Sequence, residues 1–189
     1  MACVAATGGE VRIQNIIPKH LESISAKMRE MSVEIEEYDD YLVVRSDGKL
    51  TPTTVKTSPY PGFPTDMHPQ MSVLMCAAGG ISYLREGVFD NRFRYVEELS
   101  RMGAKIKVDG KTAIIEGGSP LTAAKVTSVD LRAGAALIIA ALIPGAKTEI
   151  SEINRIERGY DNIVGKLKAL GADIKKIYVP DEDAMEMAN

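Results

Sequence analysis

A segment of about seventy residues recurs along the chain, and each copy contains the same helix-and-turn signature. The signature occupies residues 26–35, 96–106 and 164–174. Each copy ends on an isoleucine, and these isoleucines are 71 and 68 positions apart. A repeat of this length is a supersecondary unit that buries its apolar face only by packing on its neighbours. The sequence therefore predicts a fold built from three copies of one unit.

The last two copies also contain a nearly uninterrupted apolar run that directly follows an aspartate. The runs are residues 67–78 after Asp66 and 131–143 after Asp130, whereas the first copy has only residues 1–6, because the chain begins inside its run. A helix that is apolar on all sides must be buried on all sides, whereas the helix in each signature is amphipathic. We therefore expect three buried helices at the centre, sheets around them and amphipathic helices facing solvent. The arrangement has approximate threefold symmetry, and its first repeat is truncated.

Strand and helix patterns alternate along the chain, so the expected fold class is α/β. Amphipathic helices are predicted to begin near Pro18, Tyr95 and Ile163. Residues 46–64 are rich in Thr, Pro and Gly, and we expect them to form an organised linker between the first two repeats. Strands are predicted at residues 11–14, 41–44, 81–84, 104–108, 112–116, 125–127 and 148–153.

Charge and hydropathy exclude several classes of protein. The 189 residues carry a net charge of −3 with a pI near 5.5, so we expect neither nucleic acid nor an acidic membrane surface as a partner. No apolar stretch reaches the roughly 18 residues that a membrane span requires. Met1 is not followed by a secretory signal pattern. These features predict a cytoplasmic protein.

The cysteines and histidines do not form a metal-binding pattern. Cys3 and Cys76 lie in apolar runs without paired spacing, which indicates buried thiols in a reducing compartment rather than a disulfide or a metal site. His20 and His68 are far apart, which favours surface or packing roles. The sequence contains no glycine-rich phosphate loop, nucleophile elbow or zinc signature. We therefore expect neither a metal nor another cofactor.

Charged residues cluster near the predicted starts of the apolar helices. Asp66 and Asp130 occupy matching positions, and the arginines expected near the same face are Arg92, Arg132 and Arg158. Exposed N–H groups at helix starts, together with guanidinium groups, favour a negatively charged substrate, and an aspartate there can accept a proton. The alternative is that both aspartates are N-caps and that Arg92 and Arg158 are solvated. Arg132 interrupts an apolar helix, so it requires an anionic partner.

Four motifs stand out along the chain: Phe63-Pro-Thr-Asp-Met67, Asn91-Arg-Phe93, Asp130-Leu-Arg-Ala133, and Arg158-Gly-Tyr160 followed by Leu167-Lys-Ala-Leu-Gly-Ala172. Together they resemble one enzyme family, the UDP-N-acetylglucosamine 1-carboxyvinyltransferases, which are enolpyruvyl transferases that begin peptidoglycan synthesis. The resemblance implies a two-domain enzyme in which each domain consists of three βαβαββ units and the active site lies between the domains. We expect this chain to be the carboxy-terminal one, a single domain over residues 1–177 with a tail at 178–189. Its repeats are expected at about 1–45, 58–118 and 119–177.

The resemblance also implies roles for individual residues. Asp66 would contact the glucosamine 3-hydroxyl of UDP-N-acetylglucosamine and accept its proton, and the backbone of Val88 would bind the same nucleotide sugar. Arg158 would hold the carboxylate or phosphate of phosphoenolpyruvate. Further charged groups beside these three would be Arg92, Arg132 and Asp130. Attack of the sugar hydroxyl on the enol carbon and loss of phosphate would then leave the enolpyruvyl ether.

The chain departs from the family pattern at several points. The family's Lys-Asn pair near the N-terminus and its mobile loop with a reactive Cys or Asp are absent, and neither Cys3 nor Cys76 matches that loop residue. His68 stands where the family usually has Gln, and residues 154–155 read Asn-Arg where it often has Tyr-His.

These departures leave two classes of function open. In the first, the chain is about half of a carboxyvinyltransferase, inactive alone, whose partner is the missing amino-terminal domain. In the second, it is a non-catalytic nucleotide-sugar-binding or regulatory module of the same fold. The truncated first run is also expected to leave apolar surface exposed and to favour self-association.

Overall fold

The structure is a computed structural model, and it describes residues 1–143, 145 and 147–178. The chain divides into two compact units, one from Met1 to Gly159 and one that begins at Tyr160. The predicted tail lies outside the described residues from position 179 onward.

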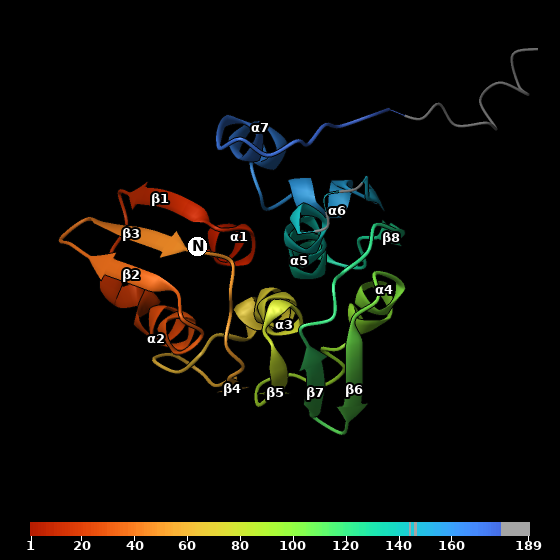
Figure 1. The fold of residues 1–189 in the computed structure, drawn as a ribbon, viewed down its shortest axis with the longest axis horizontal. Coiled ribbons are helices and arrows are strands. Elements are labelled where there is room, and N and C mark those ends of the chain that lie inside the picture. The colour runs from red at the N-terminus through yellow and green to blue at the C-terminus, as the bar shows by residue number, and fades with distance from the viewer. Residues whose placement is uncertain (144, 146, 179–189) are drawn as a thin grey trace, which may run out of the picture. The chain divides into compact units, whose positions relative to one another are not determined.

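Three helices pack against one another at the centre of the first unit (Figure 1). They are α1 (Ala2–Thr7), α3 (His68–Ala77) and α5 (Leu131–Leu142). Nine of the ten residues of α3 are buried, and α5 is buried from Ala133 to Ala140. Each fully buried Leu or Met side chain contributes about 1.5–3 kcal/mol relative to its exposed state, so these helices form the core that holds the unit together. The prediction of three central helices is confirmed.

Sheets lie around this helical centre (Figure 1). The first contains β1 (Gly9–Gln14), β2 (Glu34–Glu37) and β3 (Tyr41–Ser46), antiparallel in the order β1-β3-β2. The second contains β4 (Thr54–Lys56), β5 (Gly80–Arg85), β6 (Lys105–Asp109) and β7 (Thr112–Gly117) in the order β4-β5-β7-β6. Only its β4–β5 pair is parallel. A parallel pair of β8 (Lys125–Thr127) and β9 (Glu149–Ser151) forms the third.

The segments repeat one order of elements. The middle segment runs β4-α3-β5-α4-β6-β7 and so has the complete βαβαββ order, and the first follows the same order without its first strand. The third begins in the same way, with β8-α5-β9. The remaining helices are η1 (Pro18–Leu21), α2 (Glu22–Glu30), η2 (Thr65–Met67), α4 (Val96–Arg101), α6 (Asn154–Glu157) and, in the second unit, α7 (Ile163–Ala169).

The recurring signature is explained by one way of ending a helix. After α2, α4 and α7 the chain passes through a residue with positive φ: Ser32 at 71°, Gly103 at 86° and Gly171 at 97°. In each copy the amide of the next residue donates to the carbonyl five positions earlier, as Val33 does to Met28. This is the Schellman motif, which favours glycine because a side chain is strained at positive φ. The first copy adopts it with serine.

Besides the short turn η2, three elements were not predicted. Strand β4 lies inside residues 46–64, which the sequence indicated as a linker, and it starts the second repeat. Its three residues alternate between exposed and buried, but three residues are too few for alternation to predict a strand. Strand β2 has one buried residue among three glutamates, and α6 is a single turn, too short for helical periodicity.

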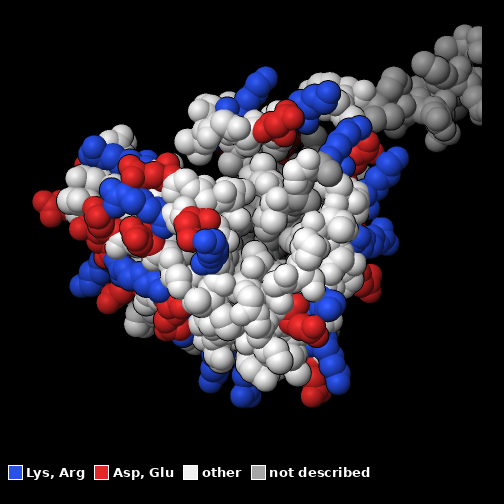
Figure 2. Space-filling view, viewed as in Figure 1, with Lys and Arg blue, Asp and Glu red and all other residues white. Residues whose placement is uncertain are grey.

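The predicted environment of the thiols is found for one cysteine. Cys76 is buried in α3, and burial raises the pKa of its thiol to about 12, whereas Cys3 is partly exposed; both are free. Among the described residues, no helix has the length and hydropathy to cross a bilayer, and no cluster of three metal-ligating side chains is found. Acidic and basic side chains are interspersed on the face shown in Figure 2, notably over the β1-β3-β2 sheet.

Candidate active site at the starts of the buried helices

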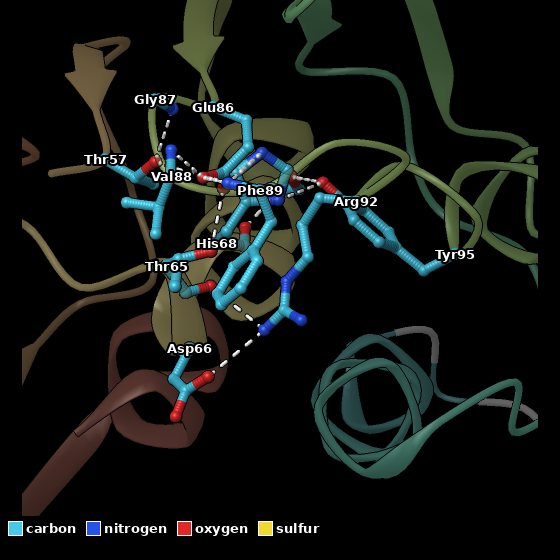
Figure 3. Close-up of polar contacts among 11 residues, drawn as sticks. Thr57, Thr65, Asp66, His68, Glu86, Gly87, Val88, Phe89, Arg92 and Tyr95 are labelled. Carbon is cyan, nitrogen blue, oxygen red and sulfur yellow. Dashed lines mark hydrogen bonds and ion pairs between the residues drawn. The ribbon is translucent and has the colours of Figure 1, made fainter.

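The carboxylate of Asp66 lies between two arginines that come from other parts of the chain. Asp66 belongs to the short turn η2, immediately before α3. Arg92 donates from Nη2 to Oδ1 at 3.1 Å (Figure 3), and Arg132 donates from Nη2 to Oδ2 at 2.7 Å. Arg132 is in the first turn of α5, so the starts of α3 and α5 lie next to each other, as the sequence predicted. The anionic partner that Arg132 was expected to require is Asp66.

The two matching aspartates have different roles in the fold. Asp130 has an extended backbone and caps α5, because its Oδ1 accepts the N–H groups of Arg132 at 2.9 Å and Ala133 at 2.8 Å. Asp66 does not cap α3. The residue after it, Met67, is still in a helical conformation and is itself the N-cap position, so the Asp66 carboxylate is left to meet the arginines. The N-cap alternative is therefore right for Asp130 and wrong for Asp66.

Arg92 is held from two further sides. Its Nη2 also donates to the carbonyl of Thr65 at 3.5 Å, and its guanidinium lies over the ring of Phe89, 5.6 Å from the centroid. Its side chain is 20% exposed, against 55% for Asp66. Exposed ion pairs contribute only about 0–1 kcal/mol to stability, so this arrangement serves to position charge rather than to hold the fold together.

Arg158 lies beside the start of α5. It is an exposed residue at the C-cap of α6. The neighbouring Gly159 packs on Leu131, the first residue of α5, so closely that a Cβ there would lie 2.8 Å from the Leu131 Cδ2 atom. Helix α6 is held against α5 by Gly134, where a Cβ would lie 2.4 Å from Ile156 Cγ1. In the described part of the chain, Arg158 makes no ion pair with Asp66.

Val88 follows strand β5 and is fixed through its backbone to a buried acid. The N–H of Val88 donates to Glu86 Oε1 at 2.7 Å (Figure 3). Burial raises the pKa of Glu86, but hydrogen bonds from Thr57, Val88, Phe89 and Thr65 outweigh it and hold the pKa below its usual value. Glu86 therefore stays ionised.

Sequence reasoning missed Glu86, although a signal for it was present. Residues 82 and 84 of β5 point into the core, and alternation along a strand makes position 86 the next inward position. A glutamate there must be paired or hydrogen-bonded, because a buried charge without partners is strongly unfavourable.

His68 is fully buried in α3 next to Glu86. Its Nδ1 lies 3.1 Å from the Tyr95 hydroxyl, which lies 2.5 Å from Ser72 Oγ. Among the described residues its Nε2 has no hydrogen-bond partner, and it lies 3.9 Å from Glu86 Oε2. The pKa of His68 is lowered to about 4, chiefly by burial; the negative charge of Glu86 opposes this shift and the positive charge of Arg92 adds to it. The imidazole is therefore neutral at pH 7. The sequence predicted either a packing role or a surface position for His68, and the packing role is right.

Comparison with known proteins identifies the family. The model of the EPSP synthase (3-phosphoshikimate 1-carboxyvinyltransferase) family matches residues 1–167. The chain belongs to the enolpyruvyl transferases. A solved enolpyruvyl transferase, NikO from Streptomyces tendae, superimposes with a TM-score of 0.85 at 27% identity, covering 95% of this chain and 43% of that one. The fold family expected from the sequence motifs is therefore confirmed, whereas among the described residues the complete βαβαββ order is found only in the middle segment.

Curated relatives carry the name of one enolpyruvyl transferase. This chain is 52% identical to UDP-N-acetylglucosamine 1-carboxyvinyltransferase 3 of Caldanaerobacter subterraneus, and the aligned region covers 94% of this chain and 42% of the relative. It is 49% identical to the UDP-N-acetylglucosamine 1-carboxyvinyltransferase of Desulfofundulus thermocisternus over 92% of its own length and 72% of that protein. The chain thus spans less than half the length of the Caldanaerobacter relative.

Proposed function

We propose that the chain is one domain of a UDP-N-acetylglucosamine 1-carboxyvinyltransferase. The reaction transfers the enolpyruvyl group of phosphoenolpyruvate to the 3-hydroxyl of UDP-N-acetylglucosamine and releases phosphate. The observation that carries the proposal is the Asp66 carboxylate, held at the meeting point of two buried helices by Arg92 and Arg132. Relatives that are 50–52% identical over 94% of this chain, a stretch that makes up 42% of their own length, bear the name of this activity.

In this reaction Asp66 takes the proton of the sugar hydroxyl, and the hydroxyl oxygen forms a bond to C2 of phosphoenolpyruvate. The methylene carbon gains a proton at the same stage from a general acid that the amino-terminal domain would supply, which gives a tetrahedral intermediate. Loss of a proton from that methyl group and cleavage of the bond between C2 and the phosphate oxygen then yield the enolpyruvyl ether. A carboxylate of ordinary basicity suffices when it is well placed, because positioning supplies much of the rate.

The arginines bind the anionic substrates and stabilise charge as the intermediate forms. We assign Arg158 to the carboxylate or phosphate of phosphoenolpyruvate, and Arg92 and Arg132 to the positive potential around it. Each oxygen of Asp66 accepts a hydrogen bond from one arginine and keeps a second lone pair, so the sugar hydroxyl can donate to Asp66 while both arginine contacts remain. Asp130 would then keep Arg132 in place by capping α5.

The remaining parts of the proposal concern the setting of the site. A second, amino-terminal domain would supply the rest of the substrate cradle, and residues 1–177 would form a single domain. Cytoplasmic location is favoured by the free, buried thiol of Cys76, which suits a reducing compartment. Self-association of the isolated chain stays a prediction, which sedimentation velocity would test.

The proposal is tested by measuring phosphate release from phosphoenolpyruvate in the presence of UDP-N-acetylglucosamine. The chain is assayed alone and mixed with the separately expressed amino-terminal part of the same enzyme. We expect activity only in the mixture, and loss of that activity in Asp66→Ala and Arg158→Ala. The control variants are Asp90→Ala and Arg101→Ala, which remove exposed charges of the same kind. A mixture of folded parts without activity would refute the proposal and favour the non-catalytic binding module.

A further inference from the structure

The carboxylate of Glu86 joins two segments that border the candidate site. Its side chain is only 1% exposed. Its Oε1 accepts hydrogen bonds from Thr57 Oγ1 at 2.7 Å and from the N–H groups of Val88 at 2.7 Å and Phe89 at 3.1 Å. Its Oε2 accepts one from Thr65 Oγ1 at 2.9 Å. A single buried charge therefore receives four hydrogen bonds, as Figure 3 shows.

Of the four residues that donate to Glu86, Val88 is itself a candidate site residue, and Thr65 and Phe89 are direct neighbours of candidate site residues. Thr65 precedes Asp66 in the chain, and its carbonyl accepts from Arg92. Phe89 provides the ring over which the Arg92 guanidinium lies. One carboxylate thus fixes the turn that carries Asp66 on one side and the backbone at Val88 on the other.

The loop after β5 is shaped to bring its amides onto this carboxylate. The N–H of Gly87 donates to Thr57 Oγ1 at 2.8 Å, the same hydroxyl that donates to Glu86. A Cβ at Gly87 would lie 2.4 Å from the Thr57 carbonyl oxygen, so a residue with a side chain does not fit there. The Gly87 position therefore lets the chain turn closely enough for Val88 and Phe89 to reach Glu86.

We propose that Glu86 is a positioning residue, which holds the Val88 loop and the turn of Asp66 in the mutual orientation that nucleotide-sugar binding requires. Hydrogen bonds to an ionised buried group are stronger than those between neutral groups, so removal of the carboxylate releases both segments together. That the ligand is a nucleotide sugar rests on the proposed function. That the loop at Val88 is released when the Glu86 carboxylate is removed does not depend on it.

Glu98 provides a matched control within the same chain. It is also a buried glutamate, 6% exposed, and its Oε2 accepts the N–H of Thr127 at 2.8 Å and pairs with Arg101 at 3.7 Å. Its carboxylate ties α4 to β8 instead of the two segments beside Asp66. Loss of stability that follows simply from removing a buried carboxylate should therefore be common to Glu86→Ala and Glu98→Ala.

The first measurement is amide hydrogen exchange in the isolated chain, followed residue by residue by NMR. We expect Glu86→Ala to accelerate exchange at Val88 and Phe89 by about tenfold or more, because the lost hydrogen bonds to a charged group limit local opening. Glu98→Ala should instead accelerate exchange at Thr127. Glu86→Gln should restore most of the protection, since its amide oxygen can replace Oε1 as the acceptor. Equal exchange at Val88 and Phe89 in the wild type and Glu86→Ala would overturn the proposal.

The second measurement is steady-state kinetics of the reconstituted mixture. Glu86→Ala should raise KM for UDP-N-acetylglucosamine about tenfold more than Glu98→Ala does, and Glu86→Gln should recover most of that loss. A KM raised equally by both alanine variants would show a merely structural role and overturn the proposal. If the wild-type mixture is inactive, the proposed function fails instead, and the exchange rates alone decide whether Glu86 positions the loop.

Discussion

Replacing His68 by Gln should make the chain less sensitive to mild acid. His68 is fully buried among Tyr95, Phe93 and the charged side chains of Glu86 and Arg92. Burial lowers the pKa of this histidine from 6.5 to about 4. As the pH falls below 6.5, the unfolded chain therefore takes up a proton that the folded chain does not. Each further fall in pH therefore lowers the unfolding free energy, until both states are protonated below about pH 4 and the loss stays at its full size.

The size of the effect follows from the two pKa values. A difference of this size corresponds to about 3 kcal/mol of unfolding free energy, lost between neutral pH and strongly acid conditions. At pH 5 about 2 kcal/mol of this is already lost, because most of the unfolded chains are then protonated at this position. Since the pKa of Glu86 is held below its usual 4.5, Glu86 remains ionised at pH 5 and its protonation adds to the loss only in stronger acid.

Urea unfolding at pH 8 and pH 5 measures this difference. The wild type should lose about 2 kcal/mol more than His68→Gln between the two pH values, since the amide of Gln does not titrate. His20→Gln, which removes an exposed imidazole, is the matched control variant. Equal losses in the wild type and His68→Gln would show that His68 takes up its proton equally readily in both states, and the reasoning from burial would be refuted.

Three further changes test other contacts. Asp130→Ala removes the cap of α5 and should lower the unfolding free energy by about 1 kcal/mol, whereas Asp66→Ala should lower it less; thermal unfolding that ranks them the other way would contradict the assigned roles. Gly134→Ala should cost about 1–3 kcal/mol by forcing Ile156 away from α5, and an unchanged melting temperature would argue against that packing. Cys76 should react with a thiol reagent at pH 8 only after unfolding, because burial raises its pKa to about 12; since Cys3 is also free, the labelled site is identified by peptide mapping, and rapid labelling at Cys76 in the native chain would contradict its burial.

The features that could be predicted from the sequence are those that a single physical requirement determines. Two helices that are apolar on every side had to be central. A cation inside one of them had to lie beside an acidic residue, so the sequence predicted an anionic partner for Arg132. Asp66 and Asp130 could not be told apart, because the difference lies in one extra helical turn, η2, before α3. Glu86 was accessible in principle from strand alternation, but its partners on residues 57 and 65 come from outside its own strand.

The position of Arg158 could not be derived from its own neighbourhood in the sequence. It depends on α6, a four-residue helix without a detectable period, and on the close packing of Gly134 and Gly159 against side chains distant in the chain. The absence of a side chain at a glycine gives no indication of which residue will fill the space. Such contacts appear only when the tertiary structure is known.

The central position of α3 has a consequence for synthesis of the protein. Nine of its ten residues are buried, partly against α5, which the ribosome completes only at Leu142. At roughly 5–20 residues per second, the interval between the end of α3 at Ala77 and that point is about 3 to 13 s. During that interval the nascent chain carries an apolar helix without one of its two central neighbours. A chaperone that binds exposed apolar segments on the ribosome would have α3 as its natural substrate in this chain.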